Sequence, residues 1–389
     1  MGDAPIRVLH VIDGDDDGDG PIVVRRLAER APAGVAVHLL VLERAEEPAG
    51  PDSPAGPEEP EGERGPADDD EQSERVDPAF VSTVRLPVDG PWWRVGRLAR
   101  RVSAVIEAVG PHVVHSHSVR ADLAVTVGRH RPAAIRVATR HGPVRIAADP
   151  RPLRWQTRAA GVLSARLDVV VADGERTRAR LRSAGYRPGR SRTIGSGVPI
   201  VDDPLLGPRP RRLLSLSPGR PDSDYPTLLA AFREVRRLFP DVRLACGGDG
   251  VDGDNRDLVD LVDSHGLRPA IDLIGPVDDV TGELEASIAL VLVSGSGAVP
   301  RSGLEAIASG TPVITTDVGR SSRLAVKDFQ VVPPREPKTL AGAIRHLLCL
   351  PDPEYDRLVL LSHQHARDEF DIARTVQAYD ELYRELLGR

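Results

Sequence analysis

The sequence predicts an α/β protein made of two doubly wound domains, and three observations support this. The chain has 389 residues, far more than one ordinary hydrophobic core requires. Short apolar, β-branched runs alternate with longer amphipathic stretches, which is typical of parallel sheets covered by helices on both faces. The pattern restarts after a linker at 201–211, where aspartate, proline and glycine cluster. We therefore expect two Rossmann-like domains that face each other across a ligand-binding cleft.

The first domain is expected at 1–200 and contains six predicted strands. These strands are expected at 7–12, 36–42, 113–115, 135–139, 169–172 and 192–194. A helix is predicted at 93–109, because its apolar residues fall on one face. Since the strands are short and separated by helical segments, they predict a parallel sheet.

The second domain is expected at 212–365 and repeats this pattern. Its strands are expected at 212–216, 242–247, 271–274, 288–293, 312–315 and 330–332. Helices are predicted at 225–238, 302–309 and 337–350, and residues 353–387 are expected to be mostly helical. We expect the last segment, 366–389, to pack back on the first domain.

The charge of the chain is concentrated in one segment. There are 51 Lys and Arg residues against 58 Asp and Glu, a net charge of −7. Residues 45–75 contain twelve acids and two arginines, a net of −10, so the remainder is mildly basic. With six prolines, four glycines and few apolar residues, this segment is predicted to be a disordered insertion. The alternative is an acidic tether for a basic partner or a mimic of phosphate.

Composition also limits the chemistry and the location of the protein. Lys327 and Lys338 are its two lysines, which leaves lysine-based mechanisms few candidates. The two cysteines, Cys246 and Cys349, lie in apolar runs and are expected to be small core residues. No secretory signal or long apolar run is visible, so a cytoplasmic protein is expected, with at most peripheral contact at the inner face of the membrane. No nucleic-acid partner is expected.

The most specific segment runs from Val293 to Gly319 and includes Gly303-Leu304-Glu305. It resembles the signature of family 4 glycosyltransferases, which are retaining enzymes of the GT-B fold with two Rossmann-like domains. Further stretches resemble the same family in the same order, at 111–118, 139–142, 225–232, 243–250 and 274–277. Together the matches imply the GT-B fold over nearly the whole chain.

The resemblance implies a site for a nucleoside-diphosphate sugar in the second domain. Ser302, Gly303 and Leu304 would present backbone N–H groups to the diphosphate at a helix N-terminus. Glu305 would accept hydrogen bonds from the ribose hydroxyls, although it could equally be a first-turn acid that stabilises the helix. The resemblance also places Gly275 and Val277 at the turn that meets the nucleotide base.

In the first domain, the resemblance implies that His141 lies near the sugar or the phosphate. The alternative is a histidine at the end of a strand that bonds to a local carbonyl. His115 and His117 alternate along a strand, so we expect them to face opposite sides of the sheet. No zinc-type spacing is present, and the family's retaining members need no catalytic metal, so neither a metal site nor a required cofactor is expected.

The sequence departs from the family pattern after its first strand. The family has a Gly-Gly loop there, whereas this chain has five aspartates within Asp13–Asp19. These carboxylates would repel a diphosphate. A weaker alternative is that they bind Ca²⁺ or Mg²⁺, although the closing glutamate of an EF-hand is missing.

Three polar positions of the donor site are also altered. Pro218 and Ser223 occupy the positions of an arginine and a lysine that hold the diphosphate in the family, and Gly297 replaces a glutamate beside the sugar. Arg220 and Arg301 are nearby cations that could partly compensate. We therefore assign His141, Arg220 and Arg301 to the catalytic set.

Two functions follow from these expectations. The first is a retaining hexosyltransferase that moves a sugar from a nucleoside-diphosphate sugar to a glycan, lipid-linked or small-molecule acceptor. The second is a catalytically impaired relative that acts as a binding or partner subunit of an active transferase. The sequence favours the enzyme, and the altered charges keep the alternative open.

Overall fold

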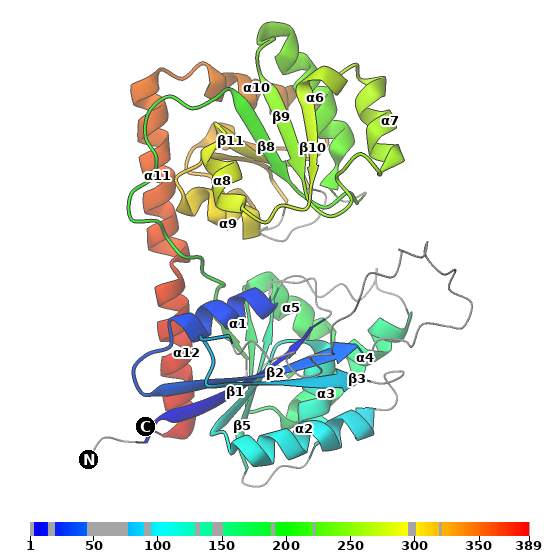
Figure 1. Ribbon diagram of the computed structural model, residues 1–389, viewed down its shortest axis with the longest axis vertical. Helices are drawn as coiled ribbons and strands as arrows, with labels where there is room; N and C mark the ends of the chain where they lie inside the picture. Colours follow the sequence, from blue (N-terminus) through cyan, green and yellow to red (C-terminus); the bar gives the residue numbers. More distant parts are fainter. Residues whose placement is uncertain are drawn as a thin grey trace, which may run out of the picture. The chain divides into compact units, whose positions relative to one another are not determined.

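The computed structural model describes residues 4–14, 20–44, 77–88, 95–128, 133–141, 151–187, 191–220, 223–294, 301–318 and 321–388. The chain divides into two compact units (Figure 1). Unit 1 comprises Met1–Ile194 and Val376–Arg389, and unit 2 comprises Gly195–Thr375. Each unit is a parallel sheet with helices on both faces, which confirms the predicted α/β class.

Unit 1 contains a seven-stranded sheet with the order β3-β2-β1-β4-β5-β6-β7. Its strands are β1 (Ile6–Asp13), β2 (Val35–Arg44), β3 (Ser82–Val88), β4 (Val113–Ser116), β5 (Ile135–Arg140), β6 (Val169–Ala172) and β7 (Ser191–Thr193). The six predicted strands are all present, and β3 was not predicted. Most of β3 is only partly buried at the edge of the sheet, so it lacks the continuous apolar run that marks the other strands.

Helices cover both faces of the unit 1 sheet. They are α1 (Gly20–Glu29), α2 (Val95–Val109), α3 (Val119–Val127), α4 (Arg151–Leu163) and α5 (Glu175–Ser183). Leu98, Val102 and Ile106 of α2 join α3 in a core against β1, β2 and β4. The helix α1 lies on the opposite face (Figure 1), where Val24 packs against alternate residues of β2. The amphipathic pattern of 93–109 therefore correctly identifies α2.

Unit 2 contains a six-stranded sheet with the order β10-β9-β8-β11-β12-β13. Its strands are β8 (Arg212–Leu216), β9 (Arg243–Gly247), β10 (Ile271–Gly275), β11 (Ala289–Leu292), β12 (Val313–Thr316) and β13 (Val331–Val332). Its helices are α6 (Tyr225–Leu238), α7 (Arg256–Ser264), α8 (Val280–Glu285), α9 (Arg301–Ala308), α10 (Pro337–Leu348) and α11 (Asp352–Phe370). One core joins α6, α7 and α10 to the sheet, and a second joins α8, α9 and α11 to its other face. Cys246 is buried in the first of these cores, as predicted. Cys349 is exposed directly after α10, so the prediction that Cys349 is a core residue was wrong.

The mostly helical C-terminal stretch is divided into α11 and α12 (Ile372–Leu387). The break follows from a contact within unit 2, because Val198 pairs with Asp371 in an isolated bridge. The Val198 N–H donates to Phe370 O at 2.8 Å, and Val198 O accepts from Ile372 N at 3.0 Å. Beyond the break, α12 packs on the sheet of unit 1 and buries Tyr379 and Tyr383.

Candidate functional site

The strand order of unit 2 defines where a ligand would bind. β8 lies between β9 and β11, so the connections after β8 and β11 leave in opposite directions. In doubly wound sheets this switch point, outside the carboxyl ends of the strands, is the usual binding site. The first turn of α9 lies there, since the Ser302 hydroxyl is 3.5 Å from Leu216 O at the end of β8. Ser302 and the predicted phosphate-binding turn therefore lie beside the switch point.

Arg301 and Glu305 form an ion pair on the first turns of α9. Arg301 Nε donates to Glu305 Oε1 at 2.8 Å. The Arg301 side chain is 32% exposed to solvent and the Glu305 side chain 16%. The pair uses one guanidinium nitrogen, so the other two nitrogens of Arg301 can donate to further acceptors. A ligand at this helix end would meet a partly neutralised arginine together with the backbone N–H groups.

Gly303 has a packing role that the sequence did not indicate. A Cβ at this position would lie 2.4 Å from Leu324 Cδ1 and 2.9 Å from Leu292 Cδ1. Leu304, the next residue, is buried in the same core of unit 2. The glycine therefore allows α9 to approach β11 closely, independently of any ligand.

The loop after β8 is closed by neutral hydrogen bonds. Ser223 Oγ donates to Pro218 O at 2.6 Å, so the two positions where the family has cations contact each other directly. Gly219 N donates to Asp249 O at 2.8 Å, and a Cβ on Gly219 would lie 2.2 Å from Gly250 O. The loops after β8 and β9 are thus packed together.

Arg220 has an exposed side chain, with no ion pair to another residue of the described part of the chain. Its backbone closes the same loop, since Arg220 N donates to Pro218 O at 2.7 Å and Arg220 O accepts from Ser223 N at 3.0 Å. The guanidinium is therefore available to an anionic ligand. Gly297 lies outside the described residues.

The turn after β10 contains Gly275 and Val277. Gly275 has a φ of +69°, a left-handed conformation that favours glycine. Gly275 O accepts from Gly248 N at 2.7 Å, which connects this turn to the end of β9. Val277 lies against the same strand end, where a Cβ on Gly247 would be 2.7 Å from Val277 Cγ2. The turn is therefore fixed to the carboxyl edge of the sheet.

Unit 1 has its own switch point between β1 and β4, and four histidines gather beside it. His10 and His115 are register partners on these two strands. His10 Nδ1 and His117 Nε2 are 2.8 Å apart, and His117 Nδ1 and His141 Nε2 are 2.9 Å apart. The three imidazoles therefore form a hydrogen-bonded chain, His10–His117–His141.

His115 completes this group through hydroxyl partners. Its Nδ1 is 2.6 Å from the Tyr383 hydroxyl, and its Nε2 is 2.7 Å from Thr139 Oγ1. Thr139 Oγ1 in turn lies 3.0 Å from the Tyr379 hydroxyl. The two tyrosines belong to α12, so the end of the chain contributes directly to this group.

The expectation that His115 and His117 face opposite sides was wrong. Their ring centroids are 4.1 Å apart. Side chains alternate between the faces of a sheet with a period of two, so residues two apart, such as His115 and His117, point to the same face. Sequence reasoning also missed His10, Tyr379 and Tyr383. The position of His10 on the strand beside the switch point was the available signal, because doubly wound sheets place the first and fourth strands together.

Burial keeps these histidines neutral. It lowers the pKa of His10 to about 3, with a smaller contribution from His141. Burial and the charge of Arg140 lower the pKa of His141 to about 4. The pKa values of His115 and His117 are also well below the usual range, chiefly because of burial. At neutral pH each ring therefore has one donor and one acceptor nitrogen.

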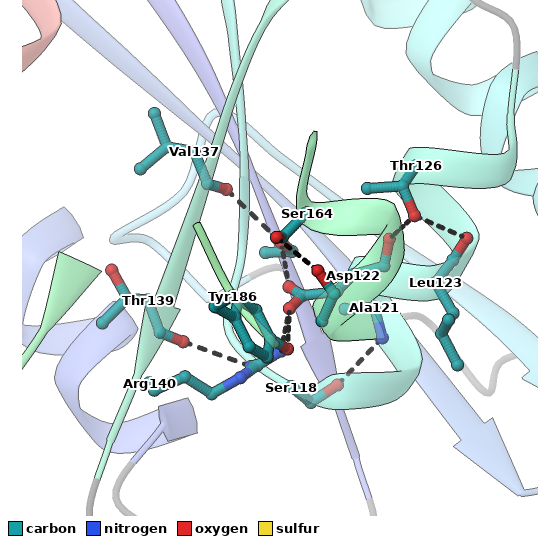
Figure 2. Close-up of polar contacts among 12 residues, drawn as sticks. Ser118, Ala121, Asp122, Leu123, Thr126, Val137, Thr139, Arg140, Ser164 and Tyr186 are labelled. Atoms are coloured by element: carbon teal, nitrogen blue, oxygen red, sulfur yellow. Dashed lines mark hydrogen bonds and ion pairs between the residues drawn. The ribbon is translucent and has the colours of Figure 1, made fainter. Parts of the chain in front are cut away.

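A buried ion pair holds the end of β5 next to His141. Arg140 Nη2 contacts Asp122 Oδ2, and the Tyr186 hydroxyl donates to the same oxygen at 3.1 Å (Figure 2). Ser116 Oγ donates to Asp122 Oδ1 at 2.6 Å. Burial acts to lower the pKa of Arg140, but the Asp122 carboxylate outweighs it and the net shift is upward. The positive charge beside His141 is therefore permanent.

The acidic loop after β1 is described only at its start. Asp13 Oδ1 is paired with Arg120 Nη1 at 3.0 Å, so this carboxylate is already compensated. Residues 15–19 and the acidic segment at 45–75 lie outside the described residues. Within the described part of the chain, no helix is long and apolar enough to cross a membrane.

Comparisons with known proteins agree with this architecture. The family model for Glycosyltransferase Family 4 matches residues 22–201, and that for Glycosyl transferases group 1 matches residues 215–349. HepE of Anabaena, solved in complex with UDP-glucose, superimposes with a TM-score of 0.74 and 16% identity over 98% of this chain and 100% of that one. Sucrose-phosphate synthase of Thermosynechococcus elongatus superimposes with a TM-score of 0.72 and 19% identity. The match covers 98% of this chain and 99% of the synthase. Fold and family matches together define a glycosyltransferase-type protein of the GT-B fold.

Two curated relatives are similar over part of their length. An exopolysaccharide phosphotransferase of Streptomyces coelicolor is 29% identical over 238 residues, which cover 57% of this chain and 24% of that protein. Glycogen synthase of Mycobacterium tuberculosis is 26% identical over 198 residues, 49% of this chain and 47% of the synthase. The matches thus span about a quarter and about half of these relatives. The chain belongs to the family 4 glycosyltransferases, as the signature predicts.

Proposed function

We propose that the protein is a retaining hexosyltransferase that uses a nucleoside-diphosphate sugar as its donor. The observation that carries the proposal is the position of α9, whose first turn lies at the switch point of the unit 2 sheet and carries Arg301 and Ser302, with Glu305 one turn further on. A helix N-terminus with an adjacent arginine favours a diphosphate, which gains charge as the glycosidic bond breaks.

In this proposal each unit has a different role. Arg220, Arg301 and the N–H groups of Ser302, Gly303 and Leu304 stabilise the departing diphosphate. Glu305 binds the ribose, and the turn at Gly275 and Val277 binds the base. His141 of unit 1 contacts the sugar or its phosphate. Retention would follow if the sugar–phosphate bond breaks while the β-phosphate takes the proton of the acceptor hydroxyl, which attacks from the same face.

The neighbours support the choice of donor. HepE has been solved with UDP and with UDP-glucose, so the same fold accommodates a nucleoside-diphosphate sugar. We propose the same class of donor here, and a glycan, lipid-linked or small-molecule acceptor. No required metal or other cofactor enters the reaction as proposed. We place the protein in the cytoplasm, at most peripheral to the inner face of the membrane.

A second candidate is a catalytically impaired protein that serves as a partner subunit of an active transferase. The hydrogen bond between Ser223 and Pro218 favours it, because a neutral contact stands where the family has two cations. Two charge-assisted contacts of about 1.5–3 kcal/mol each are missing there. Their loss would lower the rate by on the order of 100-fold or more.

Calorimetric titration with UDP-, GDP- and ADP-sugars separates the two candidates. The transferase should bind one of them at micromolar concentration, and binding should be followed by transfer or hydrolysis of the sugar. Donor binding without turnover would favour the impaired relative, and no binding of any donor would rule out the enzyme.

The alignment itself can be tested by restoring the family charges. Pro218→Arg, Ser223→Lys and Gly297→Glu together should raise donor affinity, although Ser223 is buried and its hydrogen bond is lost. An unchanged affinity in a folded variant would show that these positions do not face the donor.

A further inference from the structure

We propose that His10, His115 and His117 form a binding site for a divalent transition metal ion of the zinc type within unit 1. The three residues are buried, and each offers an imidazole nitrogen within 4.8 Å of the other two. Imidazole is a preferred ligand of Zn²⁺, Ni²⁺ and Cu²⁺, and three histidines leave one coordination position for water. The expected fold and family assign no metal to this position.

The three ligand nitrogens lie within 4.8 Å of one another, so the rings would have to move into a tetrahedral arrangement to hold an ion. Ligand nitrogens about 2.0–2.1 Å from zinc lie roughly 3.3 Å apart. His10 Nδ1 and His117 Nε2 are now 2.8 Å apart with a proton between them, so they would separate by about half an ångström. The ion takes the place of that proton, which moves to the other nitrogen of the same ring so that the imidazole stays neutral.

The surrounding groups supply the outer hydrogen bonds that a metal site requires. Both nitrogens of His115 have hydroxyl partners, Tyr383 and Thr139, so the nitrogen that does not bind the metal remains oriented by a hydroxyl. His117 binds the metal through Nε2, and its Nδ1 then donates to His141 Nε2 at 2.9 Å. Each of these two ligands thus keeps a partner outside the coordination sphere.

A pocket reaches one of the three proposed ligands, His10. It lies between α12 and the β1 and β2 side of the unit 1 sheet, and its lining includes His10, Tyr379, Tyr383 and Asp380. Asp380 Oδ1 is buried without a hydrogen-bond partner among the described residues, whereas Oδ2 accepts from Arg384 Nε. A carboxylate oxygen on the wall of this pocket favours a cation over an anion.

Metal binding would also set the protons of the histidine chain. With His117 Nε2 on the ion, its Nδ1 must donate, so His141 must accept at Nε2 and hold its own proton at Nδ1. His141 Nδ1 is buried and has no partner among the described residues. If the proposed transferase function is correct, the metal would make His141 Nδ1 a hydrogen-bond donor towards the ligand. This last step rests on that function, whereas metal binding does not.

The test is a titration of chelator-treated protein with Zn²⁺ against a chromophoric chelator. We expect one ion per chain, and His10→Gln, His115→Gln and His117→Gln should each weaken binding by more than about 100-fold. His141→Gln, one shell further out, should weaken it by about 10–100-fold. His38→Gln is the matched control, because His38 lies on the same sheet and bonds only to Ser82 Oγ in the described contacts. It should bind Zn²⁺ like the wild type.

Co²⁺ provides a second measurement that does not depend on any buried variant folding. The wild type should give the visible spectrum of a tetrahedral nitrogen site without a thiolate charge-transfer band, which excludes Cys246 and Cys349 as ligands. The absence of micromolar binding would overturn the proposal, as would undiminished binding in folded His10, His115 and His117 variants. All these readouts are independent of sugar transfer, so they distinguish failure of the metal site from failure of the proposed enzyme function.

Discussion

At the residue scale, Arg301 has two roles. It forms an ion pair with Glu305, and it is the first residue of α9, where it places a positive charge at the start of the helix. We expect Arg301→Gln to weaken donor binding at least about 10-fold, because one charge-assisted contact to a phosphate contributes about 1.5–3 kcal/mol. Calorimetry with the preferred nucleotide sugar measures this change. Arg243→Gln is the control, because it removes a similar ion pair, with Asp272, from the start of β9 at the opposite edge of the sheet. Equal donor affinities in the two variants would show that Arg301 does not contact the donor.

The neutral histidines make the stability of unit 1 depend on pH. Their pKa values are lowered by folding, so below about pH 6.5 the unfolded chain binds more protons than the folded chain. Stability therefore falls with decreasing pH, by up to about 1.4 kcal/mol per pH unit for each fully buried histidine. The fall should continue until the folded pKa is reached, which for His10 is about 3.

Urea unfolding followed by tryptophan fluorescence in the presence of a chelator measures this effect. The three tryptophans, Trp92, Trp93 and Trp155, all fall within the sequence range of unit 1, so we use their fluorescence to follow this unit. His10→Gln should make the dependence between pH 7 and pH 5 shallower. A stability independent of pH over this range would show that the histidines are not protected from protonation.

Residue types and spacing predicted some of these features and could not predict others. Arg301 and Glu305 stand four apart on α9, so their pairing follows from helical geometry, although the helix was predicted to begin one residue later, at Ser302. The histidine group does not, since His10 and His115 are 105 positions apart and meet because β1 is beside β4. The closed loop at Ser223 depends on backbone carbonyls, whose positions no residue pattern records.

At the scale of single elements, the contact between α9 and β11 depends on the absence of a side chain at position 303. Gly303→Ala should destabilise unit 2 by about 1–2 kcal/mol, because the added methyl meets the buried Leu292 and Leu324. Gly342→Ala is the matched control in α10, where a Cβ meets nothing within 4 Å. That change should stabilise the protein by about 0.5–1 kcal/mol through helix propensity.

Thermal and urea unfolding of both variants compare the two glycines directly. Opposite signs for positions 303 and 342 would support the packing role of Gly303. Equal stabilisation would mean that α9 can move away from β11 without cost, and Gly303 would then be explained by the ligand instead.

Elements were predictable where burial is continuous. The buried strands β1, β8 and β11 follow from apolar runs, whereas β3 is partly exposed and was missed. The break at Asp371 was also missed, because it is caused by Val198, which lies far away in the sequence. Local pattern therefore gives the existence of an element more readily than its ends, which depend on tertiary contacts.

At the scale of the whole molecule, unit 1 is discontinuous and its last part is α12. Deletion of Val376–Arg389 removes four buried side chains, Val376, Tyr379, Leu382 and Tyr383. Since burying each contributes about 1.5–3 kcal/mol, unit 1 should lose several kcal/mol or fail to fold. Tryptophan fluorescence reports this loss, with Tyr383→Phe as a milder variant that removes only the hydroxyl bonded to His115.

Unit 2 provides the internal control for that deletion. Cys246 is buried in its core, so the rate at which a thiol reagent modifies it measures the opening of unit 2. We expect this rate to stay unchanged in the truncated protein, while Cys349 reacts at once in both. If both units open together, they do not fold as separate units.

The discontinuity of unit 1 has a consequence for the order of events during synthesis. A ribosome releases the strands of unit 1 first, then all of unit 2, and only then the tyrosines that cover His115 and Thr139. Unit 2 is formed by one continuous segment, so it can fold while the unit 1 sheet still lacks its last helix. In the meantime an apolar face of the nascent sheet stays uncovered and open to chaperones. Ribosomes stalled within unit 2 should therefore carry a protease-sensitive N-terminal half, which becomes resistant once α12 has emerged.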